Sequence, residues 1–155
     1  MTWIDNYNKS KNESSFYELR DFSLLKITGE DAQAVLQGQS TNDLNNLADK
    51  AVHLSALLTP QGKVISHHFV LKMNKKDFYL LCSKSVINDV KEHLDKHIIM
   101  EDADLRICEE LKVYHLYKAD HRLEKLFSLP QEPLLADTIY EQEDQLFVTG
   151  GMLGI

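Results

Sequence analysis

The residues best suited to bind a ligand lie together in one short polar segment of the sequence. Side-chain amides, a hydroxyl and a carboxylate occur there close together, in Gln39, Thr41, Asn42 and Asp43. Together they offer both donors and acceptors of hydrogen bonds to a polar ligand. The same residue types also close helix ends and form Asx turns, which is the alternative interpretation for each residue alone. As a set, they predict a loop that faces a ligand.

A pair of histidines, His67 and His68, lies in an otherwise apolar stretch. By the period of two in a strand, His67 shares a face with Ile65, Phe69 and Leu71. A histidine among apolar residues is usually a hydrogen-bonded core residue, although a partly buried imidazole also serves as a pH-sensitive polar contact. Neighbours on a strand point to opposite faces, and the other His and Asp positions show no ligand spacing, so we predict no metal site.

The two cysteines, Cys82 and Cys108, are not spaced as a Cys-x-x-Cys motif. We interpret them as free thiols of a reducing compartment that behave as small buried apolar groups. The sequence has no glycine-rich phosphate loop, no nucleophile elbow and no Ser/His/Asp arrangement of a hydrolase. We therefore assign no catalytic residue.

The polar loop is positioned by a strand and a short helix that precede it. Residues 22–27 form an apolar strand, and Thr28 is expected to cap the following helix together with Asp31. The apolar residues of that helix fall on one face: Ala32, Val35 and Leu36.

Beyond the loop at 42–50, the pattern predicts an antiparallel sheet with a covering helix. Alternating segments joined by polar turns predict three strands, at 51–59, 63–72 and 78–82. The first of them places Val52, Leu54, Ala56 and Leu58 on one side. A helix at 85–97 follows, with Val86, Val90 and Leu94 four residues apart, and then a strand at 104–109. This order defines an α+β fold class.

The remaining segments predict a second, smaller set of elements. Residues 111–117 form a strand that starts a second sheet, residues 123–127 a short helix, and residues 137–140 and 145–149 a closing hairpin. The chain shows no closing element after this hairpin, so we expect the pattern to be incomplete at its C-terminus.

The block from Leu25 to Asp43, with its Leu-Gln-Gly-Gln-x-Thr core at residues 36–41, resembles the N-terminal signature of a known superfamily. This is the folate-binding aminomethyltransferase, or glycine-cleavage T-protein, superfamily. The form of the motif is most similar to the YgfZ branch, whose members support iron–sulfur enzymes and tRNA modification. The resemblance continues through residues 57–70 and the helix at 85–97, and it fades after residue 107.

The sequence departs from the superfamily in two places. YgfZ-type proteins carry a Lys-Gly-Cys motif followed by Gly-Gln-Glu in their second half, which this chain lacks. True aminomethyltransferases place an acidic pair in the hairpin strand near the folate, where this chain has Ser66 and His67. The carboxylate expected to steer methylene transfer is therefore missing.

The resemblance implies a site for tetrahydrofolate or another reduced folate. It places Phe22 where an aromatic side chain stacks on the folate ring, His67 where the acidic pair would be, and the loop of Gln39 to Asp43 at the mouth of the cavity. The alternative for Phe22 is a core residue at the start of a strand.

The resemblance also implies a division of the chain and a function. Residues 1–15 are a mobile lead-in, residues 16–50 the first part of the folate-binding domain, residues 51–109 a sheet-and-helix subdomain, and residues 110–155 a return to the first domain. The function implied is a YgfZ-like one in iron–sulfur cluster assembly or repair and, indirectly, tRNA modification, with iron–sulfur proteins as candidate partners and no independent catalysis. The alternatives are a tetrahydrofolate-dependent aminomethyltransferase and a scaffold domain that has lost its ligand.

Composition limits the other partners. The 155 residues carry a formal net charge of −7, which argues against direct binding of nucleic acid because phosphate contacts need clustered Lys and Arg. No apolar run approaches a membrane span, and the N-terminus shows no secretory signal. The cytoplasm is therefore the expected location.

Overall fold

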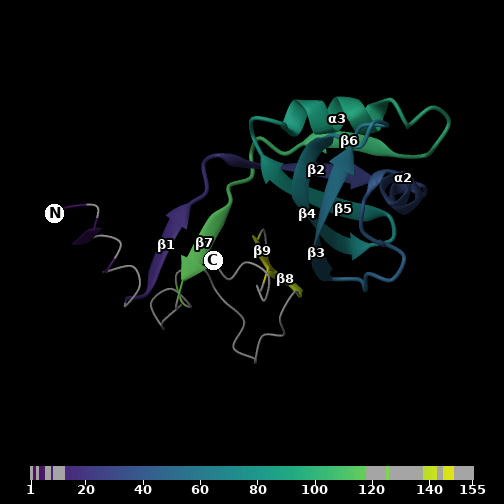
Figure 1. Ribbon diagram of the computed structural model, residues 1–155. Coiled ribbons are helices and arrows are strands. Elements are labelled where there is room, and N and C mark those ends of the chain that lie inside the picture. The colour runs from purple at the N-terminus through teal and green to yellow at the C-terminus, as the bar shows by residue number, and fades with distance from the viewer. Residues whose placement is uncertain are drawn as a thin grey trace.

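The computed structural model describes residues 2, 4–5, 8, 13–117, 125, 138–142 and 145–148, and its centre is a five-stranded sheet (Figure 1). The strands lie in the order β3-β4-β5-β2-β6. Their bounds are Ala51–Leu58 for β3, Val64–Asn74 for β4, Asp77–Ser83 for β5, Phe22–Thr28 for β2 and Asp104–Ile107 for β6. All neighbouring strands are antiparallel, which confirms the predicted α+β class together with the two helices.

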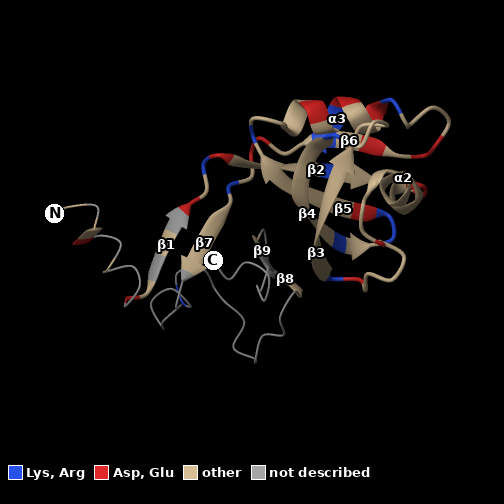
Figure 2. Ribbon diagram, in the orientation of Figure 1, with Lys and Arg blue, Asp and Glu red and all other residues tan. Residues whose placement is uncertain are grey.

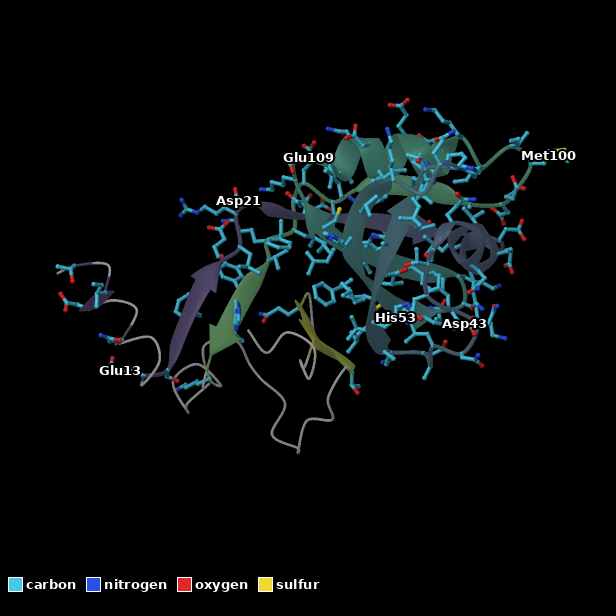
Figure 3. The ribbon with its side chains drawn as sticks, in the orientation of Figure 1. Glu13, Asp21, Asp43, His53, Met100 and Glu109 are labelled. Atoms are coloured by element: carbon cyan, nitrogen blue, oxygen red, sulfur yellow. The ribbon has the colours of Figure 1, made fainter. Side chains whose placement is uncertain are left out.

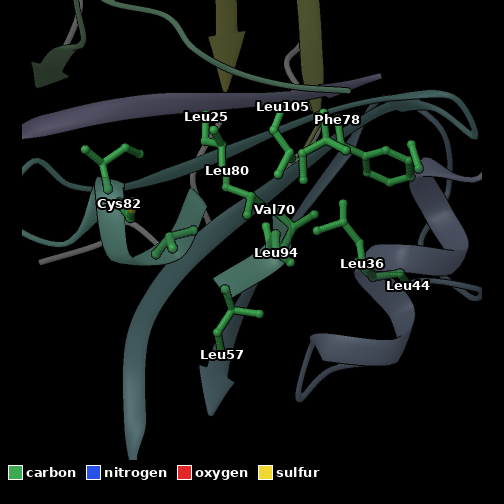
Figure 4. Packing of buried hydrophobic residues seen from close by; sticks show 14 residues of the cluster. Leu25, Leu36, Leu44, Leu57, Val70, Phe78, Leu80, Cys82, Leu94 and Leu105 are labelled. Atoms are coloured by element: carbon green, nitrogen blue, oxygen red, sulfur yellow. The ribbon is translucent and has the colours of Figure 1, made fainter. Parts of the chain in front are cut away.

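Two helices, α2 (Ala32–Gln39) and α3 (Ile87–Asp95), pack on one face of this sheet and bury the larger apolar cluster with it. We call this cluster the main core. The helices contribute Leu36, Val90 and Leu94, and the sheet contributes alternate residues of each strand, such as Leu25, all of them fully buried (Figure 4). The predicted helix at 85–97 is confirmed in position, although its regular part is shorter.

The opposite side of the sheet, the second face, carries a smaller apolar cluster. Val52, Leu71 and Met73 are buried there together with Ile139, which belongs to strand β8 (Ile139–Gln142). Along β2, every second residue from Phe22 onward points to this face, because the residues between them are buried in the main core.

Two pairs of short strands complete the described structure. β1 (Ser15–Glu18) pairs with β7 (Tyr114–Tyr117), and β8 pairs with β9 (Gln145–Val148), both antiparallel. The predicted second sheet and closing hairpin are thereby confirmed, whereas β1 was not predicted. The short helix predicted at 123–127 lies outside the described residues apart from Lys125, and so does most of the predicted lead-in.

The junction between β2 and α2 depends on Gly29. Its φ of 133° is a backbone conformation that other residues rarely adopt, and a Cβ at this position would lie 2.0 Å from the carbonyl oxygen of Asp102. The predicted cap by Thr28 is wrong. Asp31 is the N-cap and makes no side-chain cap bond, because its carboxylate accepts the backbone N–H of Asp102 at 2.9 Å instead.

Candidate functional site

Phe22 begins β2 at one end of the second face. Its side chain is 36% exposed, in contrast to the fully buried residues of the main core. Its neighbour on β5 is Ser83, and its backbone N–H donates to the carbonyl of Leu19 at 3.1 Å. The strand therefore presents an aromatic ring that is partly available to solvent.

His67 lies on the same face and near the same end as Phe22. The register pairs Phe69 with Leu81 across β4 and β5, so His67 and Ser83 each lie two residues further toward this end. Phe22 pairs with Ser83, and the pairing of β4 with β5 ends at Phe69 and Leu81, so Phe22 and His67 lie on the same face and toward the same end of the sheet, on strands that β5 separates. His67 is exposed, and the structure brings it and Phe22 together on one surface.

A β-bulge corrects the prediction for the neighbours of His67. Leu57 pairs with Ser66 but Leu58 pairs with Val64, which leaves Ile65 as the extra residue in β4. Ile65 packs against the main core and not with Phe69 on the second face. Ser66 is also turned away from this face and buried, with its hydroxyl donating to the carbonyl of His67 at 3.0 Å.

His68 points from β4 to the side of the sheet that carries the helices, and it is 2% exposed. Burial, together with smaller contributions from the nearby His53 and His67, lowers its pKa to about 4. Within the described part of the chain, neither ring nitrogen of His68 has a hydrogen-bond partner, and the same holds for the hydroxyl of Ser55 opposite it on β3. This imidazole is therefore held neutral at ordinary pH.

The side chains of the polar loop mostly hold the loop itself. Thr41 bonds Ala56 of β3 twice, because its N–H donates to the carbonyl of Ala56 at 3.1 Å and its hydroxyl accepts the N–H of Ala56 at 3.0 Å. Asn42 donates to the carbonyl of Leu54 at 3.1 Å. Asp43 accepts the N–H of Asn45 at 2.9 Å. The contacts of Thr41 and Asn42 fix the loop along the edge of β3, and that of Asp43 forms an Asx turn within the loop, the alternative interpretation for this residue.

Gln39 is separated from the other predicted residues of the loop. Its side-chain oxygen lies 3.0 Å from Nε2 of His93 on α3, on the side of the sheet that carries the helices. Asp43 lies near His53 of β3 (Figure 3). Burial lowers the pKa of His53, and the Asp43 carboxylate opposes that shift.

Lys72 supports this loop from below, and the sequence interpretation missed it. The ammonium group of Lys72 is buried and donates to the carbonyls of Leu47 at 2.8 Å and Leu44 at 3.4 Å, with Asp49 at 3.8 Å. The sequence did contain a signal for this role, a lysine inside an apolar strand. Such a side chain is rarely buried without partners, so it indicates polar groups nearby.

The cysteines are free and buried, as predicted. Burial raises the pKa of the Cys82 thiol to about 11 and also raises that of Cys108, so neither is a thiolate at neutral pH. Among the described residues, no three His, Cys, Asp or Glu side chains are grouped closely enough to hold a metal ion. The described helices are also too short or too polar to cross a membrane.

The arrangement of the sheet and its helices defines the class of protein. The structure superposes on the glycine cleavage system aminomethyltransferase T from Bartonella henselae with a TM-score of 0.78, at 16% identity, over 89% of this chain and 38% of that one. At this identity the likeness establishes the fold alone. It is the α+β fold of the glycine-cleavage T-protein.

The sequence comparison identifies the family. The family described as the GCVT N-terminal domain matches residues 1–115, and the chain belongs to it. An uncharacterized protein of Haemophilus influenzae is 33% identical over 95 residues, which are 60% of this chain and 34% of that protein. The tRNA-modifying protein YgfZ of Aliivibrio fischeri is 30% identical over 108 residues, 68% of this chain and 34% of its own length. Other relatives are named aminomethyltransferase. This chain spans about a third of the length of these two relatives.

Proposed function

We propose that this chain is the folate-binding part of a YgfZ-like protein and that a reduced folate, such as tetrahydrofolate, lies on the second face beside Phe22 and His67. The observation that supports this most is that residues 45 positions apart in the sequence, an exposed aromatic ring and an exposed imidazole, lie on one sheet face toward the same end of the sheet. Membership of the T-protein family supports a folate as the ligand.

In this proposal Phe22 supplies a flat face for stacking, and His67 supplies a polar group at one edge of the ligand. Thr41 and Asn42 contribute by holding the loop against β3, Asp43 by fixing the turn within the loop, and Gln39 through its contact with α3. The domain division made from the sequence stays a prediction. Its boundary at residue 50 separates β2 from β3, β4, β5 and β6, although these five strands form one sheet.

The wider role proposed is support of iron–sulfur cluster assembly or repair and, indirectly, of tRNA modification, in the cytoplasm. The relatives named tRNA-modifying protein YgfZ are 28–30% identical and those named aminomethyltransferase 24–27%, which supports this choice. The absence of a carboxylate at Ser66 and His67 supports it as well, because methylene transfer requires a negative charge near the reacting amine.

Titration with 5-formyltetrahydrofolate tests the proposal. Phe22→Ala should weaken binding by about 1–3 kcal/mol, the usual contribution of stacking on an aromatic side chain. Phe16→Ala is the matched control, since Phe16 is 45% exposed on β1, in a different sheet, and its loss should leave the affinity unchanged. If the unaltered chain binds no reduced folate, the scaffold alternative replaces this proposal.

A further inference from the structure

Two imidazoles, those of His93 and His97, lie together at the C-terminal end of α3, on the side of the sheet that carries the helices. His93 belongs to the last turn of α3, and His97 directly follows its C-cap, Lys96. Residues four apart on a helix are neighbours on its surface, a spacing that was missed here from the sequence. The centres of the two rings are 4.8 Å apart, and the ring planes are inclined by 48°. Metal-binding helices use the same spacing, because two imidazoles one turn apart can reach one ion.

The backbone beyond the helix orients the ring of His97. Its N–H donates to the carbonyl of Leu94 at 2.9 Å, so the chain continues to turn after Asp95. Nδ1 of His97 lies 2.7 Å from the carbonyl oxygen of His93, which can only accept a hydrogen bond. Nδ1 therefore carries the proton, and the lone pair of the neutral ring is on Nε2.

Gln39, at the end of α2, orients the ring of His93 in the same way. Its side-chain oxygen lies 3.0 Å from Nε2 of His93. With this oxygen as the acceptor, Nε2 carries the proton and Nδ1 carries the lone pair. Each of the two rings thus donates one N–H to a protein oxygen and keeps the lone pair of its other nitrogen. Histidines that bind metal ions are usually oriented by such outer contacts.

The separation of the rings also matches a shared ion. Zinc lies about 2.0–2.1 Å from an imidazole nitrogen, so two rings bound to it at square or tetrahedral angles have their centres roughly 5 Å apart. The structure has 4.8 Å. We propose that His93 and His97 form a binding site for a divalent transition-metal ion that takes nitrogen ligands, such as Zn²⁺, with Gln39 as a positioning residue.

Two protein ligands make an open site. Structural zinc sites have four protein ligands, whereas this pair leaves the other positions to water or to a donor atom of another molecule. Among the described residues, no third His, Cys, Asp or Glu side chain completes a group with the two rings. The coordination shell of the ion therefore has room for an external ligand.

The charges around the pair are balanced. α3 and its C-cap carry acidic and basic residues side by side (Figure 2). The two lysines of this segment pair with acids one turn away, Lys91 with Asp95 and Lys96 with Glu92, each at 2.7 Å. These carboxylates offset the ammonium groups, and the net charge of −7 attracts cations to the protein as a whole. A metal ion is therefore not repelled from the two rings.

Titration of the tag-free chain with ZnCl₂ at pH 7.5, followed in ¹H–¹⁵N spectra of the imidazole rings, tests the site. The signals of His93 and His97 should shift together and before those of the other histidines, with saturation at one ion per chain. MgCl₂ at the same concentration should not reproduce the shifts, because Mg²⁺ takes oxygen ligands. This comparison uses the unaltered chain and does not depend on how any variant folds.

Calorimetry on three kinds of variant measures the contribution of each side chain. His97→Gln should weaken Zn²⁺ binding by about tenfold or more, because one imidazole alone gains nothing from intramolecular binding of the second. Gln39→Ala should weaken it by about tenfold, as the loss of an outer contact does, and Gln39→Glu should restore it, because a carboxylate also accepts the N–H of His93. The matched control is His115→Gln, which removes a half-buried imidazole of β7 in a different sheet and should leave the affinity unchanged.

Three outcomes would overturn the site. Zn²⁺ shifts that begin at other histidines would place the ion elsewhere, and an affinity that survives His97→Gln would exclude the pair as its ligands. Equal shifts with Mg²⁺ would show only attraction of cations to an acidic protein. An affinity that is unchanged in Gln39→Ala would overturn the positioning role of Gln39. The site lies apart from the second face, so none of these outcomes depends on the folate proposal.

Discussion

The two faces of the five-stranded sheet are built from the same strands but with different degrees of burial. On the face covered by the helices, Leu25 and Phe78 are completely inaccessible to solvent. On the second face, Phe22 is 36% and Leu54 is 44% exposed. Since β2 alternates between the two faces, a single strand stabilises the fold with one set of residues and leaves the other set available for contacts. The second face also has buried positions, Val52, Leu71 and Met73, so only its exposed positions are free to change without loss of the fold.

The same substitution on the two faces should give the largest contrast. Phe78→Ala empties a fully buried site and should lower the free energy of unfolding by about 3–5 kcal/mol. Phe22→Ala should lower it by clearly less, because the ring is already partly solvated. Urea unfolding of both variants measures the contrast. Equal losses would place Phe22 in the core and remove it from the proposed site.

Acid should weaken the face covered by the helices through His68. Its pKa is about 4 in the folded protein and 6.5 in an unfolded chain, so between these values the unfolded state binds more protons. The stability that a neutral His68 contributes is therefore fully present above pH 6.5. It is lost as the pH falls toward 4, by about 3 kcal/mol in total. Unfolding by urea at several pH values measures the loss.

His68→Gln provides the control for this pH dependence, since glutamine keeps polar atoms at the site without titrating. The variant should lose the part of the pH dependence that lies between pH 6.5 and 4, while the carboxylates of the protein contribute alike in both chains. An unchanged slope in this window would show that His68 is solvated or paired in solution. Its burial would then not control the stability of this face.

Periodicity predicted most of the sheet correctly because each strand is long enough to show an alternation. The strand segments at 22–27, 63–72 and 78–82 correspond to β2, β4 and β5. In β3 the predicted alternation holds, since Val52, Leu54 and Ala56 pair with Leu71, Phe69 and His67 on the second face, and the bulge at Ile65 shifts the pairing only between Leu57 and Leu58. Leu57 enters the main core and Leu54 is exposed. A bulge cannot be recognised from the hydrophobic pattern of the sequence. β1 is too short to show an alternating pattern.

The candidate site was less accessible to prediction than the fold. Phe22 and His67 were identified through resemblance, but their placement on one face toward one end of the sheet follows from strand register, which depends on partners far apart in the sequence. The polar loop looked like a set of ligand groups, whereas Thr41 and Asn42 bond the backbone of β3.

The smallest expected effect on the second face is catalytic: the chain should not transfer a methylene group from an aminomethyl donor to tetrahydrofolate. At the position of the acidic pair, Ser66 is buried toward the main core and His67 is exposed, and neither side chain carries a negative charge. A cationic amine therefore finds no carboxylate here to orient it or to stabilise an iminium-like transition state.

The two positions differ in how they would accept a carboxylate, which makes the test sharper. His67→Asp places the charge on the exposed second face and should leave stability almost unchanged, whereas Ser66→Asp buries an unpaired carboxylate and should destabilise the fold. Product formation is measured at saturating folate and donor for the unaltered chain and for His67→Asp. Turnover well above background by the unaltered chain would make the aminomethyltransferase the better interpretation. Turnover by His67→Asp alone would show that the second face lacks only the negative charge.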